Sequence, residues 1–199
     1  MQEAHDEDLL ERARGGDEEA LGRLVGHYRG RLRRMVDHRL DQRLRGRCDA
    51  SDVVQSASFE IVERFPEWSQ RRDMSFYHWC RFLTLQKLTE MGRVHLGTAK
   101  RDARRERPAE VKPGVLDSGR VAADFTDDGT LPDGTAIKNE AKARLVEVLE
   151  GMSRLDREVL VMRHFEGMSS SDVAAQLGID VETARKRYQR ALVRLKAAV

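Results

Sequence analysis

The C-terminal residues 169–196 have the pattern of two short helices joined by a tight turn, and this feature constrains the fold most. The apolar positions of the second helix step by three, four and seven residues: Val181, Ala184, Tyr188, Ala191, Leu192 and Leu195. At about 3.6 residues per turn they form one stripe, which predicts a single buried face. Ala174 and Ala175 in the first helix are small enough for close packing. Gly178 suits the turn because it lacks a Cβ.

The second helix is also strongly basic, with six basic side chains against one acid. At about 100° per residue, the side opposite the buried stripe carries Glu182, Thr183, Lys186, Gln189 and Arg190, with Arg185, Arg187 and Arg194 on the flanks. Lys186, Gln189 and Arg190 have the reach and the donors for base edges, whereas the flanking arginines suit phosphates. Asp180 is the expected N-cap. The pattern predicts a DNA-binding helix-turn-helix; the alternative is a basic helix that only faces solvent.

The distribution of charge indicates two small domains and a separator between them. The chain has 199 residues and a formal net charge of +2, which conceals a segregation of charge along the sequence. Residues 93–107 hold six basic side chains against two acids, while residues 108–135 hold six acids against two bases, interspersed with Pro and Gly. Such blocks indicate a polyanionic partner and a flexible acidic linker.

The sequence favours neither a disulfide scaffold nor a metal site. Cys48 and Cys80 are its only cysteines, and their spacing is not that of a zinc site. The first residues are acidic, and no run approaches about 18 apolar residues. We therefore expect a cytoplasmic protein without a cofactor, a bound metal or a segment inserted in a membrane.

Helical periodicity continues through the rest of the chain, and no strand-like alternation stands out. Helices are expected over residues 6–14 and 17–40, from Asp49 or Ser51 to a stop at Pro66, from Met74 or Ser75 onward, and over 136–150 and 155–165. The predicted fold class is all-α, with two helical domains on either side of the linker.

Two surfaces of the N-terminal part have alternative interpretations. Phe76, Tyr77, Trp79 and Phe82 open one helix, and the basic residues Lys100, Arg101, Arg104, Arg105 and Arg107 follow. The aromatic residues suit either a core or the stacking of unpaired bases, and the basic run suits either phosphates or a solvated face. The helix that begins near Asp49 presents Asp52, Gln55, Glu60 and Glu63, which suit solvent or a basic partner.

Several stretches in the same order and spacing resemble bacterial RNA polymerase sigma factors of the compact, extracytoplasmic-function (ECF) type. They are 8–10 (DLL) with 16–20 (GDEEA), 49–55 (DASDVVQ), 76–79 (FYHW) and 155–160 (LDREVL) running into the terminal helices. The resemblance covers nearly everything except the linker. It implies a promoter-specificity subunit and not an enzyme, with the polymerase clamp coiled coil and flap, promoter DNA and an anti-sigma factor as partners.

The resemblance also implies where each partner binds. Residues 5–107 would form a region 2-like domain that binds the polymerase through Asp49, Asp52 and Gln55 and the minus-ten element through Trp79, Gln86, Glu90, Lys100, Arg101, Arg104 and Arg105. Residues 108–135 would be the linker. Residues 136–199 would form a region 4-like helix-turn-helix domain that reads the minus-thirty-five element through Glu182, Thr183, Arg185, Lys186, Arg187, Gln189 and Arg190.

The chain departs from the family pattern at positions that affect the preferred minus-ten sequence and strand opening. Gln86 and Glu90 stand where Asn and Asp are usual, and Cys80 stands where housekeeping sigma factors have a second tryptophan. Two other functions remain as alternatives. A helix-turn-helix transcription regulator would share the terminal helices without being a polymerase subunit. A helical nuclease would need clustered carboxylates or histidines, whereas the six histidines here are scattered.

Overall fold

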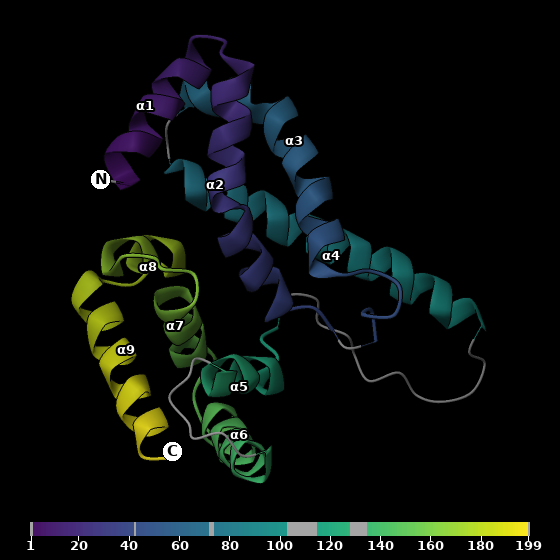
Figure 1. Cartoon of the computed structure of the whole chain (residues 1–199), viewed down its shortest axis with the longest axis vertical. Coiled ribbons are helices and arrows are strands. Elements are labelled where there is room, and N and C mark those ends of the chain that lie inside the picture. The colour runs from purple at the N-terminus through teal and green to yellow at the C-terminus, as the bar shows by residue number, and fades with distance from the viewer. Residues whose placement is uncertain (1, 42, 72–73, 103–114, 128–134, 199) are drawn as a thin grey trace. The chain divides into compact units, whose positions relative to one another are not determined.

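The structure, a computed structural model, describes residues 2–41, 43–71, 74–102, 115–127 and 135–198. Within these residues the regular secondary structure is entirely α-helical (Figure 1). The chain divides into two compact units, one of Met1–Val36 with Gln42–Gly114 and one of Asp37–Asp41 with Val115–Val199. We call them the N-terminal and C-terminal units. The predicted all-α fold with two helical parts is confirmed.

The N-terminal unit is built from α1 (Gln2–Arg14), α2 (Glu18–Asp37), α3 (Ala50–Arg71) and α4 (Phe76–Asp102). Asp17 is the N-cap of α2, and its Oδ1 accepts a hydrogen bond of 2.9 Å from the Ala20 N–H. The buried residues of α2 recur at helical spacing: Ala20, Leu21, Leu24, Val25, Leu32, Met35 and Val36. The periodic apolar face therefore became the core face.

The prediction that Pro66 ends a helix was wrong, because α3 continues through it to Arg71. Proline has no N–H, so the Val62 carbonyl loses its helical hydrogen-bond donor. Val62 lies on the exposed side of α3, where water can hydrogen-bond that carbonyl. The turn after Pro66 is held by Trp68, which is buried and packs against Trp79 of α4.

Aromatic rings from α3 and α4 form the centre of the N-terminal unit. Trp68 stacks on Trp79 with ring centroids 5.4 Å apart, and Phe76 meets Trp68 edge to face at 5.2 Å. Phe65 meets Phe76 edge to face at 5.9 Å. Such offset and edge-to-face geometries are favourable beyond the area that they bury. The core interpretation of Phe76 and Trp79 therefore holds in this structure.

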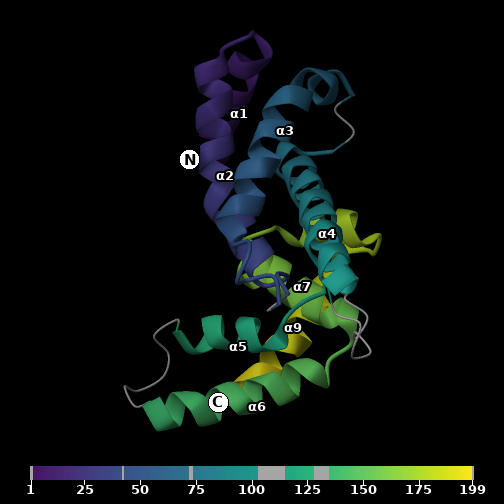
Figure 2. The same ribbon diagram turned by 90° about the vertical axis from the view of Figure 1, so that its right-hand side faces the viewer.

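The C-terminal unit is built from α5 (Ser118–Asp127), α6 (Thr135–Glu150), α7 (Arg154–His164), α8 (Ser170–Leu177) and α9 (Val181–Lys196). Helices α5 and α6 lie side by side (Figure 2). The buried core comes from four of these helices and one turn: Val121, Ala122, Leu145, Leu149, Met152, Leu160, Val161, Ala191 and Leu195. Helix α9 is thus anchored in a core to which α5 contributes.

The region expected to be a linker, 108–135, contains this helix α5. Asp117 caps it, since its Oδ1 accepts hydrogen bonds from the Gly119 and Arg120 N–H groups at 2.9 and 3.1 Å. This helix was not predicted, because the segment is rich in acidic residues. Its apolar residues Val121, Ala122 and Phe125 nevertheless recur at helical spacing. The rest of the expected linker, 108–114 and 128–134, lies outside the described residues.

The segment Asp37–Asp41 belongs to the C-terminal unit and carries two buried cationic or titratable side chains. The Arg39 guanidinium donates to Glu158 at 2.6 Å and to Glu166 at 3.1 Å, and both Arg39 and Glu166 are buried. The ring of His38 lies 2.8 Å from Asp124 through Nε2. Burial lowers the pKa of His38, and the hydrogen bond to Asp124 only partly opposes this.

Candidate nucleic-acid interface

The helix-turn-helix predicted at the C-terminus is formed by α8 and α9. Ser169 and Asp172 cap α8 reciprocally: the Asp172 N–H donates to Ser169 Oγ at 3.0 Å and the Ser169 N–H donates to Asp172 Oδ2 at 3.1 Å. Gly178 takes the left-handed conformation, φ 64° and ψ 37°. Asp180 caps α9 by accepting a 2.7 Å hydrogen bond from the Thr183 N–H. The expected turn glycine and N-cap are confirmed.

The two sides of α9 lie as the periodicity predicts. Ala184, Ala191 and Leu195 are buried, while Glu182, Arg185, Lys186, Gln189 and Arg190 are exposed. Val181, which we placed on the buried stripe, is exposed at the start of the helix. Ala174 of α8 is buried as close packing requires, but Ala175 is exposed. The exposed polar residues of α9 form a mainly basic surface, which we call the α9 face.

Two predicted members of the α9 face are engaged within their own helix. Glu182 lies 3.2 Å from Arg185 and 3.6 Å from Lys186, so it partly neutralises both cations. The Thr183 hydroxyl donates to Asp180 at 2.5 Å and thus belongs to the N-cap. Exposed pairs of this kind contribute little stability, and they can open when a phosphate approaches. Glu182 and Thr183 therefore both have local partners at the start of α9.

Arg187 is turned away from the α9 face toward α7. Its guanidinium donates to Asp156 Oδ1 at 2.8 Å, and both side chains are partly buried. Burial of Asp156 opposes ionisation, but hydrogen bonds from Ser153 and Arg187 outweigh it and lower the pKa of the carboxyl. Arg187 therefore fixes α9 against α7.

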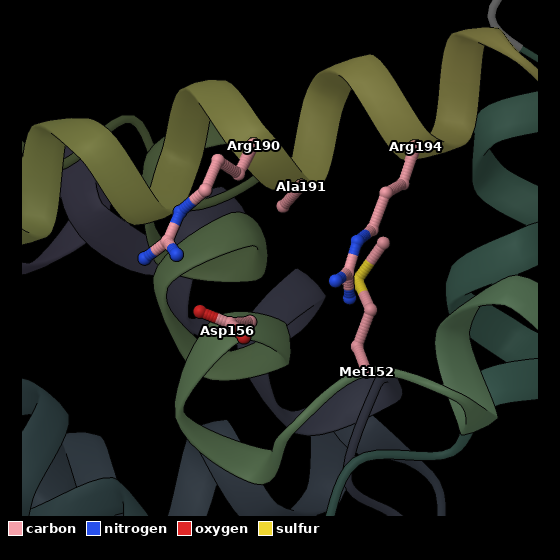
Figure 3. A pocket seen from close by; sticks show the side chains of 5 residues that line it. All are labelled: Met152, Asp156, Arg190, Ala191 and Arg194. Atoms are coloured by element: carbon pink, nitrogen blue, oxygen red, sulfur yellow. The ribbon is translucent and has the colours of Figure 1, made fainter.

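Two further arginines of α9 flank this ion pair. Figure 3 shows Arg190 and Arg194 extending from α9 toward Asp156 and Met152, and together with Ala191 these residues line a small pocket. The positive charge of Arg190 also helps to lower the Asp156 pKa. Both arginines are exposed at this edge of the helix. This position favours phosphate contacts over base contacts for Arg190.

The residues predicted to bind the minus-ten element differ in their exposure in the structure. Trp79 is 7% exposed and lies inside the aromatic cluster, so its ring is not presented to a ligand. Gln86 and Glu90 are exposed on α4, and Glu90 accepts from the Lys87 ammonium at 2.7 Å. Arg104 and Arg105 lie outside the described residues, as do the side chains of Lys100 and Arg101.

The predicted polymerase-binding residues lie at the start of α3, and two of them have a structural role. The Asp49 N–H donates to Asp52 Oδ2 and the Asp52 N–H donates to Asp49 Oδ1, both at 2.9 Å, which is a reciprocal N-terminal cap. Gln55 is exposed without such a role. On the same side of α3, Phe59 is 71% exposed and Val62 is 48% exposed.

Sequence reasoning missed this apolar part of the α3 surface. It assigned no binding role to Phe59 or Val62. The residues Asp52, Gln55, Phe59 and Val62 step by three or four, so one helical stripe holds them all. An acidic and amide start followed by two exposed apolar side chains is a composition typical of a protein-docking surface.

The described residues contain no group of His, Cys, Asp and Glu side chains that could hold a metal ion. Among the described helices, none combines the length and apolar character needed to cross a bilayer.

Comparisons with known proteins agree with the geometry. Residues 142–195 match the family model described as Sigma-70, region 4. The chain is 25% identical to RNA polymerase sigma-H factor of Pseudomonas aeruginosa, over 96% of this chain and 92% of that protein. It is 25% identical to ECF RNA polymerase sigma-E factor of Escherichia coli K12, over 94% and 90% of the two chains.

Two further similarities extend over most of the chain. ECF RNA polymerase sigma factor SigD of Mycobacterium tuberculosis is 28% identical, over 94% of this chain and 81% of that protein. The solved structure of CnrH in complex with the cytosolic domain of CnrY has the same fold, with a TM-score of 0.54 and 23% identity over 97% of this chain and 96% of that chain. With α8 and α9 inside the matched region 4, the chain is similar over most of its length to RNA polymerase sigma factors of the ECF type.

Proposed function

We propose that this chain binds core RNA polymerase and directs promoter-specific transcription initiation. The observation that carries this proposal is the α9 face, a basic surface on a helix whose other side is anchored in a core and whose start is capped. A rigid helix of this kind can enter a major groove with its polar side toward the bases. The match of this region to sigma-70 region 4 makes the minus-thirty-five element its target.

Contacts of the α9 face divide into two kinds. Lys186 and Gln189 read base edges, since both are exposed on the side of α9 away from its buried residues. Arg185 and Arg190 bind phosphates and fix the register of the helix on the duplex. Arg187 holds α9 in place through Asp156. Glu182 and Thr183 border the surface at its first turn.

The N-terminal unit binds the polymerase and the minus-ten element. The α3 stripe, with Gln55 at its polar start and Phe59 beyond, docks on the clamp coiled coil of the polymerase. Asp49 and Asp52 shape this site by capping the helix. The exposed residues Gln86 and Glu90 of α4 lie on the unit assigned to the minus-ten element. Sequence choice is then shared between two modest contacts on one chain, which raises the effective concentration of each.

In this function the chain has no catalytic residue, because the polymerase performs the chemistry. It acts in the cytoplasm, where the polymerase and the promoters are found. An anti-sigma factor that covers one of these surfaces is a further partner. The proposal excludes a catalytic metal and a cofactor from the mechanism.

The test combines binding with transcription. The purified full chain is mixed with core polymerase, recovered by pull-down, and the complex is assayed by run-off transcription on genomic fragments. We expect co-purification and transcripts that start at defined sites and require the chain. A transcription regulator that is not a polymerase subunit would bind DNA and give no promoter-specific transcription with core enzyme alone. That result would overturn the proposal.

A pair of matched variants tests the α3 surface. Gln55→Lys should weaken co-purification with core polymerase, because it puts a cation on the docking stripe without touching the N-terminal cap of α3. Gln70→Lys makes the same change on the same helix about 22 Å farther along its axis and should bind normally. Asp52→Lys is a poorer probe, since it also removes the reciprocal cap. Equal binding by both glutamine variants would remove Gln55 from the interface.

A further inference from the structure

Phe82 is exposed although its aromatic neighbours are buried. Phe76, Tyr77 and Trp79 of α4 are each less than 10% exposed, whereas Phe82 is 46% exposed. The next residue, Leu83, is fully buried, so α4 is firmly packed at this point and Phe82 lies on its outer side. A large ring on the outside of a well-packed helix costs hydration free energy, which a ligand could recover.

The ring stands at one end of a polar stripe on α4. Phe82, Gln86, Glu90 and Arg93 are all exposed and step by four, four and three residues. At about 100° per residue they fall within an arc of about 80°, so they share one side of the helix. Leu88, which lies between them in sequence, is buried on the opposite side, and Leu83 is buried at the border of the stripe, about 20° from Glu90 around the helix. Phe82 therefore shares its surface with hydrogen-bonding groups.

The chemistry of this stripe suits a nucleobase better than a protein. A protein interface needs several adjoining apolar groups, and here one ring is followed by an amide one turn away. The amide of Gln86 can donate and accept at once, as the edge of a base requires. The negative charge of Glu90 is compensated by the Lys87 ammonium, 2.7 Å from one of its oxygens. Arg93 adds a positive charge at the far end, where it can meet a phosphate.

We propose that Phe82 is a stacking surface for an unpaired base of the promoter strand, with the Gln86 amide contacting the edge of that base. This inference rests on the proposed function and names a residue for it that the family resemblance did not supply. Trp79, the aromatic residue implied by that resemblance, instead supports α4 from within by stacking on Trp68. The residue that we assign to base stacking is therefore the exposed Phe82 and not the buried Trp79 three residues before it.

The test uses the full chain bound to core polymerase and a promoter obtained by run-off transcription. The probe is a single-stranded oligonucleotide of its downstream element, with 2-aminopurine in place of one adenine at a time. We expect Phe82→Ala to weaken binding of this oligonucleotide by about 5- to 100-fold, the range for loss of one base stacked on an aromatic ring. Phe82→Tyr should restore binding to within about twofold. The 2-aminopurine that stacks on Phe82 should brighten in Phe82→Ala.

Two controls separate this inference from the function on which it rests. Val94→Ala removes an exposed apolar side chain of α4 about 120° away from Phe82 around the helix and should leave oligonucleotide binding unchanged. Affinity for core polymerase, measured for every variant, should not change.

If the wild-type chain itself fails to bind core polymerase, the proposed function is refuted and this inference with it. If the wild type binds and opens promoters but Phe82→Ala does so equally well, only the role of Phe82 is refuted. Loss of core affinity in Phe82→Ala would make this surface a protein-docking site and would also refute it.

Discussion

The N-terminal unit has a cluster of four aromatic rings at its centre, whereas the C-terminal unit holds a buried arginine between two carboxylates beside its aliphatic core. Phe65, Trp68, Phe76 and Trp79 contact one another in the first. In the second, the Arg39 guanidinium is held between Glu158 and Glu166 next to a core of valine, leucine and methionine. The aromatic cluster gains stability from area and ring geometry, which are insensitive to pH. The buried charges are stabilising only while every partner keeps its charge.

This difference predicts that the two units respond separately to mutation. Both tryptophans of the chain, Trp68 and Trp79, lie in the N-terminal unit. Tryptophan fluorescence therefore reports the unfolding of that unit, while far-UV circular dichroism reports the helices of both. Comparison of the two signals during denaturant unfolding shows which unit a substitution affects.

The largest effect is expected for Trp79→Ala. Removal of a buried indole from the aromatic cluster leaves a cavity beside Trp68, and the N-terminal unit should lose about 3–5 kcal/mol of unfolding free energy. Trp68 remains as the fluorescent reporter, and its transition should move to lower denaturant. The C-terminal helices should unfold at their original denaturant concentration. A loss below about 1 kcal/mol would mean that Trp79 is not part of the core, and would return it to the list of base-stacking residues.

Arg39→Ala should have an effect of similar or slightly smaller size on the other unit. It removes the guanidinium that neutralises Glu158 and the fully buried Glu166, which costs about 3–5 kcal/mol when one partner of a buried pair is deleted. Circular dichroism should show the C-terminal helices unfolding earlier, with the fluorescence transition unchanged. Arg64→Ala, which breaks the exposed Arg64–Glu60 pair, is the matched control and should cost less than about 1 kcal/mol.

Lys186→Ala should change binding without changing either unit. Lys186 is exposed and makes only a long pair of 3.6 Å with Glu182, so its removal should alter unfolding by less than about 0.5 kcal/mol. Loss of a base contact should weaken promoter binding by the polymerase complex by about 1–3 kcal/mol. The control is Lys142→Ala, an exposed lysine of α6 outside the α9 face. Equal promoter use by both variants would exclude Lys186 from base recognition.

Helix α9 was predictable from sequence because only one of its sides is buried. The 3.6-residue period of its apolar positions gives the buried side, and the remaining side is the α9 face. Its caps were predictable as well, since Asp180 and Gly178 are residue types that favour those backbone positions. Local chemistry and periodicity are sufficient wherever a helix packs on one neighbour.

Helix α4 was not predictable in the same way, because its first two turns are buried on all sides. From Phe76 to Arg81 every residue is buried, so no period distinguishes an inner from an outer side. Helical spacing places both Tyr77 and Phe82 off the face that holds Phe76 and Trp79, but only Phe82 is exposed. The partners of Arg39 were also beyond sequence reasoning, since Glu166 lies 127 positions away. Pro66 was misread because Trp68 packing, a tertiary contact, holds the helix beyond the proline.

The smallest effect that separates the units is their response to pH, and His38 determines its sign. Burial lowers the pKa of His38, so the folded C-terminal unit binds a proton there less readily than the unfolded chain does. The stability of this unit should therefore be complete above about pH 6.5, the ordinary histidine value, and should decline as the pH falls below it. The carboxylates of Asp124 and Glu166 favour the protonated ring and Arg39 opposes it, and their combined effect is smaller than the cost of burial.

Denaturant unfolding followed by circular dichroism at pH 7.5 and pH 5.5 measures this loss of stability. His38→Gln keeps a neutral side chain that can donate to Asp124 and should reduce the difference between the two pH values. An unchanged difference in that variant would assign the pH response to another group. Burial of His38 would then not explain how the stability of the C-terminal unit depends on pH.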